Sequence, residues 1–91
     1  MTREELIEAF KQAKSRFPKL DYEEKLYDRE YQCAFYPDEG MAVYDQDNKE
    51  FERYNEDHYC VAVKPVDNVE AALNMLDYYQ EHGEFEDEEF V

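Results

Sequence analysis

The sequence predicts an α+β fold, in which a four-stranded antiparallel meander is flanked by an N-terminal and a C-terminal helix. Apolar residues recur at helical spacing near both ends of the chain, and between them they alternate with polar residues at a period of two. Short polar turns separate the alternating stretches, which favours antiparallel neighbours because parallel strands need a long crossover. At 91 residues, the chain is expected to be a single acidic α+β domain, residues 1–91, with a small core.

The first helix is predicted over residues 2–17. Thr2 and Glu5 form a capping box, which gives each of two unpaired N–H groups at the helix start a partner. Pro18 ends the helix. Its narrow apolar stripe consists of Leu6, Phe10, Ala13 and Phe17.

The stretch at residues 19–28 is ambiguous. One interpretation is a short helix capped by Asp21, with Glu24 three residues later. The charges of this stretch are mixed and give little further information.

Four strands are predicted after this stretch, at residues 30–36, 41–45, 49–54 and 58–64. Turn residues at 37–40 and 45–48 separate the first three. The sides of these strands are predicted to group Tyr31 with Cys33 and Phe35, Met41 with Val43, Glu50 with Glu52 opposite Phe51, and Tyr59 with Val61 and Val63. Pro65 ends the last strand.

The second helix is predicted from Asp67, whose capping box includes Glu70, to Gly83, which is typical of a helix C-terminus. Its buried face is predicted to consist of Val69, Ala72, Leu73, Leu76 and Tyr79.

The net charge of −15 lies entirely in one part of the chain. Residues 1–29 contain seven acidic and seven basic residues, whereas residues 30–91 contain eighteen acidic residues against Lys49, Arg53 and Lys64. Such asymmetry indicates a charged partner rather than a particular fold.

Acidic residues on the second helix form a row with no basic residue on that helix to pair with. The row consists of Asp67, Glu70, Asp77 and Glu81, with Glu84 just beyond the helix end. It is about 25 Å long at the helical rise per residue. The first helix, by contrast, interleaves Glu4 and Glu8 with Lys11, as solvated helices usually do. A solvated face is the alternative interpretation of the row.

The predicted partner-binding surface extends this row into the hairpins and the C-terminal tail. The added residues are Asp45, Asp47, Glu50, Glu52, Glu56 and Asp57 in the hairpins, and Glu86, Asp87, Glu88 and Glu89 in the tail. The tail, residues 84–91, is expected to be partly ordered because it contains Phe85, Phe90 and Val91. These aromatics pack either on their own domain or on a second copy, so a homodimer is a further hypothesis.

The sequence gives little support for catalysis, and we expect the protein not to be an enzyme. It has no Gly-rich phosphate loop, no metalloprotease or hydrolase motif and no zinc spacing. An EF-hand beginning at Asp45 is rejected because Glu50 occupies the position that needs Gly. No metal or cofactor is expected, and Cys33 and Cys60 are interpreted as small buried residues, although a nucleophile pair with His58 stays open.

Direct nucleic-acid binding is disfavoured, because phosphates are bound by Lys and Arg. A chain with no signal peptide and no long apolar run is expected to be cytoplasmic, without a membrane contact.

In its size, its nine Tyr and its strong negative charge, the sequence resembles phage DNA-mimic anti-restriction proteins of the Arn type. The parts that carry the resemblance are the acidic hairpin "YDQDNKEFERYNEDH", the helix "DNVEAALNMLDYYQEHGE" and the end "EFEDEEFV". The resemblance implies a bacteriophage protein, located in the host cytoplasm, that inhibits a host restriction nuclease or contacts a nucleoid protein by occupying its basic DNA-binding site. The alternative is an acidic immunity-type or adaptor protein that binds one specific basic partner through a few residues.

Overall fold

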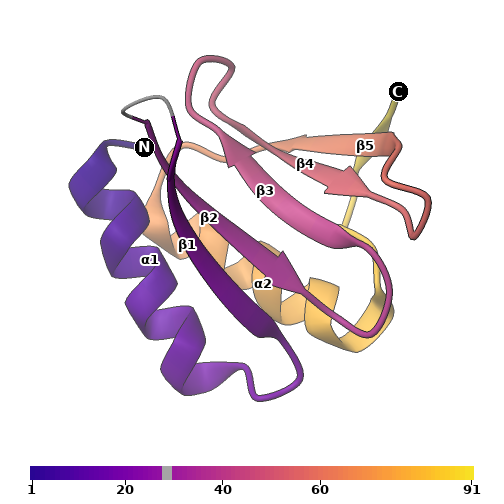
Figure 1. Ribbon diagram of the computed structural model, residues 1–91, viewed down its shortest axis with the longest axis horizontal. Coiled ribbons are helices and arrows are strands. Elements are labelled where there is room, and N and C mark those ends of the chain that lie inside the picture. The colour runs from indigo at the N-terminus through magenta and orange to yellow at the C-terminus, as the bar shows by residue number, and fades with distance from the viewer. Residues whose placement is uncertain (28–29) are drawn as a thin grey trace.

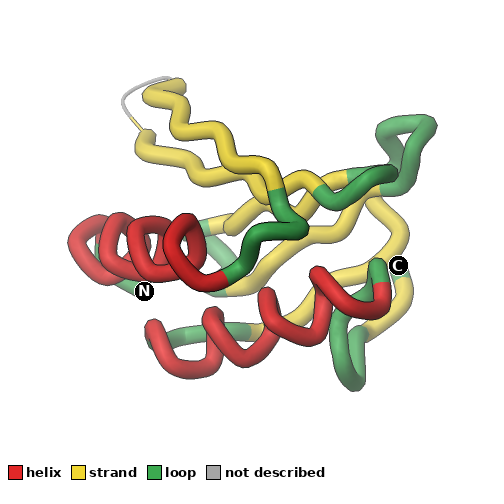
Figure 2. Tube along the Cα trace, turned by 90° about the horizontal axis from the view of Figure 1, so that it is seen from below, coloured by secondary structure: helices red, strands yellow, loops and turns green. Residues whose placement is uncertain are grey.

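The computed structural model describes residues 1–27 and 30–91, without the side chains of residues 25–31. Over these residues the chain forms helices α1 (Arg3–Arg16) and α2 (Val69–His82) and strands β1 (Asp21–Tyr27), β2 (Glu30–Tyr36), β3 (Met41–Asp45), β4 (Glu50–Tyr54), β5 (Cys60–Pro65) and β6 (Glu89–Phe90). The strands form one antiparallel sheet in the order of the chain, from β1 to β6. Both helices pack against the same side of this sheet (Figures 1 and 2). The predicted α+β class is confirmed, but the predicted number of four strands was wrong.

Strand β1 replaces the short helix that was one interpretation of residues 19–28. All seven residues of β1 pair with β2, from Asp21 opposite Tyr36 to Tyr27 opposite Glu30. Tyr22 packs edge-on against both Phe10 and Phe35, and its hydroxyl donates to the carbonyls of Ala13 and Phe17 at the end of α1. These contacts come from other elements, so the local charge pattern could not reveal the strand. Asp28 lies outside the described residues.

Strand β6 is the other strand that the sequence did not predict. It pairs Glu89 with Val63 and Phe90 with Ala62, and the Val91 N–H donates to the Val61 carbonyl. The C-terminal segment, residues 84–91, is therefore docked on the free edge of β5.

The helix caps explain where the two helices begin. The capping box of α1 is present, with Thr2 accepting from the Glu5 N–H and Glu5 accepting from the Thr2 N–H. In α2 the N-cap is Asn68, whose side chain accepts from the Ala71 N–H at 2.8 Å. The prediction of Asp67 as the cap was thus wrong by one residue. Gly83 ends α2 in the left-handed conformation, as predicted.

The core is largely a chain of aromatic rings between the sheet and the helices. Phe10 contacts Phe35, Phe35 contacts Phe51, and Phe51 contacts both Tyr44 and Phe85. Ala42 and Ala62 occupy positions of the sheet that face the helices, and both are fully buried. The predicted apolar pairs Met41 with Val43 and Val61 with Val63 consequently face away from the helices and are half-buried. Seven of the twenty buried hydrophobic residues in the described part of the chain are aromatic, and each such ring buries a large apolar area.

Candidate functional site

The structure divides the predicted partner-binding surface into separate regions. The α2 stripe keeps the five acids Asp67, Glu70, Asp77, Glu81 and Glu84, all exposed. Asp47, Glu56 and Asp57 are exposed in turns. Asp45, Glu50, Glu52 and Glu89 lie on the outer face of the sheet, which we define as the side away from the helices. The remaining acids belong to the C-terminal segment.

The α2 stripe is mostly free of positive charge. Asp67 and Asp77 accept hydrogen bonds from the neutral amides of Asn68 and Gln80, respectively. Glu81 is different, because the Lys19 ammonium lies 3.0 Å from its carboxylate, with the two side chains 61% and 50% exposed. Lys19 lies in the loop before β1 and not on α2. The helix itself therefore supplies no Lys or Arg to its acids, as predicted, and the one cation comes from another part of the fold. An ion pair so exposed contributes little to stability.

The C-terminal segment is held by an ion pair that the sequence analysis did not foresee. The Arg53 guanidinium donates two hydrogen bonds to Glu88, at 2.6 and 2.8 Å, and the side chains are only 16% and 5% exposed. Glu88 also accepts from the Phe85 N–H. Burial opposes ionisation of Glu88, but these hydrogen bonds and the charge of Arg53 outweigh it and lower its pKa. Glu88 therefore belongs to the internal structure, and its inclusion in the exposed acidic surface was wrong.

The aromatic residues of the segment have different environments. Phe85 is 2% exposed and packs against Phe51 and Tyr79, whereas Phe90 and Val91 are 78% and 80% exposed. The expected docking is thus achieved by Phe85 and by backbone pairing. Lys64 adds a bond from its ammonium to the Glu86 carbonyl. The exposed charges left on the segment are Glu84, Glu86, Asp87 and Glu89.

The outer face of the sheet concentrates negative charge near Glu50. Burial, followed by the charges of Asp45, Glu52 and Glu89, raises the pKa of Glu50. Burial and Glu52 likewise raise the pKa of Tyr54 to about 12, and the Tyr54 hydroxyl donates to Glu52. Asp45 also accepts from backbone N–H groups of the following turn. Four carboxylates from β3, β4 and β6 thus share one partly desolvated region.

Glu23, Tyr36 and Tyr54 join this face although the sequence analysis did not select them. The Tyr36 hydroxyl donates to Glu23 at 2.8 Å, across the β1–β2 pair. Glu23 reaches the outer face only because β1 is a strand that pairs with β2. The pattern of residues 19–28, which did not predict this strand, therefore could not identify Glu23. For the two tyrosines, their positions in alternating stretches were the available signal.

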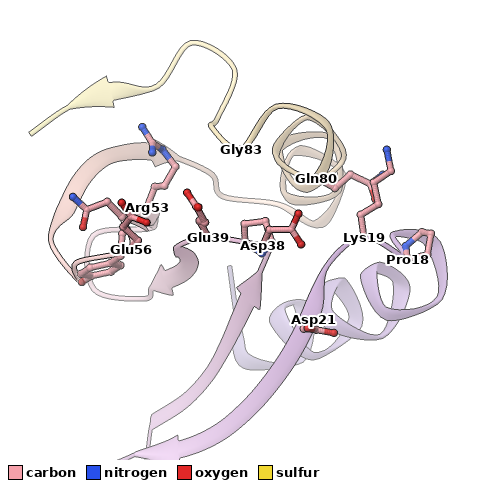
Figure 3. Close-up of a pocket in the computed structure, with 12 residues that line it drawn as sticks. Pro18, Lys19, Asp21, Asp38, Glu39, Arg53, Glu56, Gln80 and Gly83 are labelled. Carbon is pink, nitrogen blue, oxygen red and sulfur yellow. The ribbon is translucent and has the colours of Figure 1, made fainter.

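An open pocket of about 820 Å³ lies at one end of the sheet (Figure 3). Four carboxylates line it, from Asp21, Asp38, Glu39 and Glu56, together with the two cations Lys19 and Arg53. Both cations are already paired, with Glu81 and Glu88 respectively. The pocket therefore adds to the negative field of this end.

Among the described residues, no group of three His, Cys, Asp or Glu side chains is placed to hold a metal ion. Burial and the nearby Glu52 raise the pKa of the Cys60 thiol, which disfavours a reactive thiolate. Cys33 is fully buried. None of the helices in the described part of the chain is long and apolar enough to cross a membrane.

The chain has no significant match among protein-family models, curated proteins or solved structures.

Proposed function

We propose that this protein is a DNA mimic, which inhibits a basic DNA-binding protein such as a restriction nuclease or a nucleoid protein by occupying its DNA-binding site. The observation that carries the proposal is the α2 stripe. Its five carboxylates are exposed, with Glu70, Asp77 and Glu81 on α2 and with Asp67 and Glu84 just beyond its two ends. Among the described residues, Lys19 is the one cation that forms an ion pair with any of them. An ordinary solvated helix gains stability from ion pairs between acidic and basic side chains three or four residues apart. Helix α2 contains no Lys or Arg and therefore forms no such pair.

The negative charge is large for the size of the molecule. A net charge of −15 is distributed over a molecule with extents of 27 × 26 × 21 Å, whereas duplex DNA carries one charge per ~1.7 Å of its axis. The stripe alone carries about a third of that density, so turns and the C-terminal segment have to contribute the rest. A field of this size attracts a basic groove over long range and speeds association.

Removal of stripe charges tests the proposal. The variant Glu70→Gln with Asp77→Asn should inhibit DNA cleavage or DNA binding by its target at least about threefold less well at low salt, because two attractive charges are lost. The control, Glu4→Gln with Glu8→Gln, removes the same charge from exposed positions of α1. Targets are sought in a panel of restriction nucleases and nucleoid proteins, with duplex DNA as competitor. Equal inhibition by the two variants would contradict a specific role for the α2 stripe and would indicate that it is an ordinary solvated helix face.

Salt provides a second criterion. Between 0.01 M and physiological ionic strength the Debye length falls from ~30 Å to ~8 Å. Repulsion within the free protein should weaken, so its melting temperature should rise, while attraction to the DNA-binding groove should weaken over the same range.

An immunity-type or adaptor protein is the second candidate, and the exposure of Tyr59 and Phe90, at 69% and 78%, favours it. Exposed aromatics of this kind are typical anchors of specific interfaces. Such an interface should keep most of its affinity as salt rises and should depend on these two residues. Affinity that stays constant across the salt series would therefore favour this candidate over the DNA mimic.

A further inference from the structure

The outer face of the sheet contains a groove above β2, β3 and β4. Two adjoining hollows, of about 360 and 110 Å³, share Gln32, Met41 and Val43 in their lining. Ala34 lies opposite Val43 in the β2–β3 pair, and Val43 lies opposite Glu52 in the β3–β4 pair. The floor of the groove is thus apolar at its centre.

The walls of the groove are acidic and aromatic. Glu23 and Tyr36 line the smaller hollow, whereas Asp45, Glu52 and Tyr54 line the larger. Figure 2 shows that the β1–β2 hairpin rises on the side of the sheet away from the helices. The outer face is therefore bounded on one side by this hairpin, and neither helix covers it (Figures 1 and 2).

Strand register keeps the cations of β4 and β5 off this face. In the described parts of β2 to β6, the outward positions carry no Lys or Arg. Arg53 and Lys64 occupy the alternate, inward positions, opposite Ala62 and Phe51. Both are bound to the C-terminal segment, through Glu88 and the Glu86 carbonyl. The C-terminal segment thus binds the cations of β4 and β5 on the side opposite the groove, while Asp45 and Glu52 lie on the outer face.

We propose that this groove docks a basic amphipathic segment of a protein partner, with an apolar side chain on Met41 and Val43 and flanking Lys or Arg side chains against Asp45 and Glu52. Charge complementarity selects this occupant. A second copy of the face, a nucleic acid or an anionic lipid surface would bring further negative charge to these carboxylates. The hollows suit one or two apolar side chains, which is the scale of a peptide anchor rather than of a whole domain.

The inference goes beyond the proposed function, because it concerns a different surface and takes the basic character of the partner from the carboxylates of the groove itself. The α2 stripe would face the DNA-binding groove by charge alone, whereas the sheet groove adds apolar contact that a DNA mimic does not need. Binding at the groove should therefore depend on side-chain shape as well as on charge.

The test uses the full chain and two synthetic peptides. One alternates Leu with Lys and Arg, and the other has Ser in place of each Leu. The Leu peptide should bind at least about tenfold more tightly, since burying one such side chain contributes about 1.5–3 kcal/mol. Amide chemical shifts should change along β2, β3 and β4.

Two variants locate the binding. Val43→Thr keeps the β-branched shape and should weaken the Leu peptide several-fold while leaving the Ser peptide unchanged. Glu70→Gln, on the α2 stripe, should leave the Leu peptide unchanged. Equal affinity for the two peptides, or shifts confined to α2 and the C-terminal segment, would overturn the inference. The inhibition assay with the stripe variants is a separate readout, so failure of the DNA mimic and failure of the groove can be told apart.

Discussion

The ion pair between Arg53 and Glu88 should hold the C-terminal segment in place, and the variant Glu88→Gln tests this directly. Gln has nearly the same shape as Glu and can still accept one hydrogen bond, so the change removes little except the charge. It leaves the Arg53 guanidinium, only 16% exposed as a side chain, without its partner. The Phe85 N–H can keep an acceptor, so the local backbone need not change.

Burial sets the size of the effect. Removal of one member of a buried pair costs about 3–5 kcal/mol in general. Because Gln retains part of the hydrogen bonding and Arg53 retains some solvent access, we expect a loss of about 2–3 kcal/mol, or about 10–20 °C in melting temperature for a domain of this size. The exposed pair of Lys19 with Glu81 provides the matched control, and Glu81→Gln should cost less than about 0.5 kcal/mol.

The pH dependence follows from the same pair. Glu88 has a folded-state pKa below its ordinary value of 4.5, so its stabilisation is complete above that value and is lost as the pH falls through the lowered folded-state pKa. Glu88→Gln should lack this part of the acid-induced loss of stability.

The assay is urea or thermal unfolding of the wild type, Glu88→Gln and Glu81→Gln, with amide hydrogen exchange at Val91. The Val91 N–H bonds to the Val61 carbonyl, so its exchange should accelerate in Glu88→Gln if β6 detaches. The combined variant Arg53→Met with Glu88→Leu should recover much of the lost stability, since apolar replacement of a buried pair is often tolerated. Equal melting temperatures for Glu88→Gln and Glu81→Gln would refute the reasoning.

The remaining predictions concern the α2 cap and the outer face. Asn68→Ala should lower the free energy of unfolding by about 0.5–2 kcal/mol, because the Ala71 N–H loses its acceptor, whereas Asp67→Ala should change it by less than about 0.5 kcal/mol; chemical denaturation of both variants checks this. Glu50→Gln should raise the melting temperature at pH 7 by about 2–4 °C, because the raised pKa of Glu50 shows that its charge is disfavoured in the folded protein. That gain should shrink as the pH falls toward 4.5 and Glu50 becomes protonated, and a gain that is constant with pH would contradict the assigned cause.

Local sequence signals located the elements whose information lies within a few residues. The capping box of Thr2 and Glu5, the left-handed Gly83 and the alternation around Phe35 and Phe51 each depend on neighbours along the chain. The same holds for the concentration of net charge after Arg29 and for the acidic stripe of α2, which follows from helical periodicity alone.

Strand β6 required the tertiary structure because its partner β5 is distant in sequence, whereas β1 pairs with the next strand along the chain and is held by packing that its own residues do not reveal. Tyr22 is fixed by Phe10 and Phe35, and Glu89 pairs with Val63. The capping pattern of Asp21 and Glu24 made a short helix one interpretation of residues 19–28, and the aromatic residues of the acidic segment 84–91 made a partly ordered tail the expectation there.

What the sequence by itself determined is therefore the class of fold, the sign and location of the charge, and which helix carries a row of acids without a Lys or Arg of its own. Only the tertiary structure decided which charges remain available. Register turns Arg53 and Lys64 inward, where the C-terminal segment engages them, and it gathers Asp45, Glu50 and Glu52 on the opposite face. The physical reason is that a side chain's face is set by its own strand's alternation, whereas its ionic partner is set by which strands lie side by side.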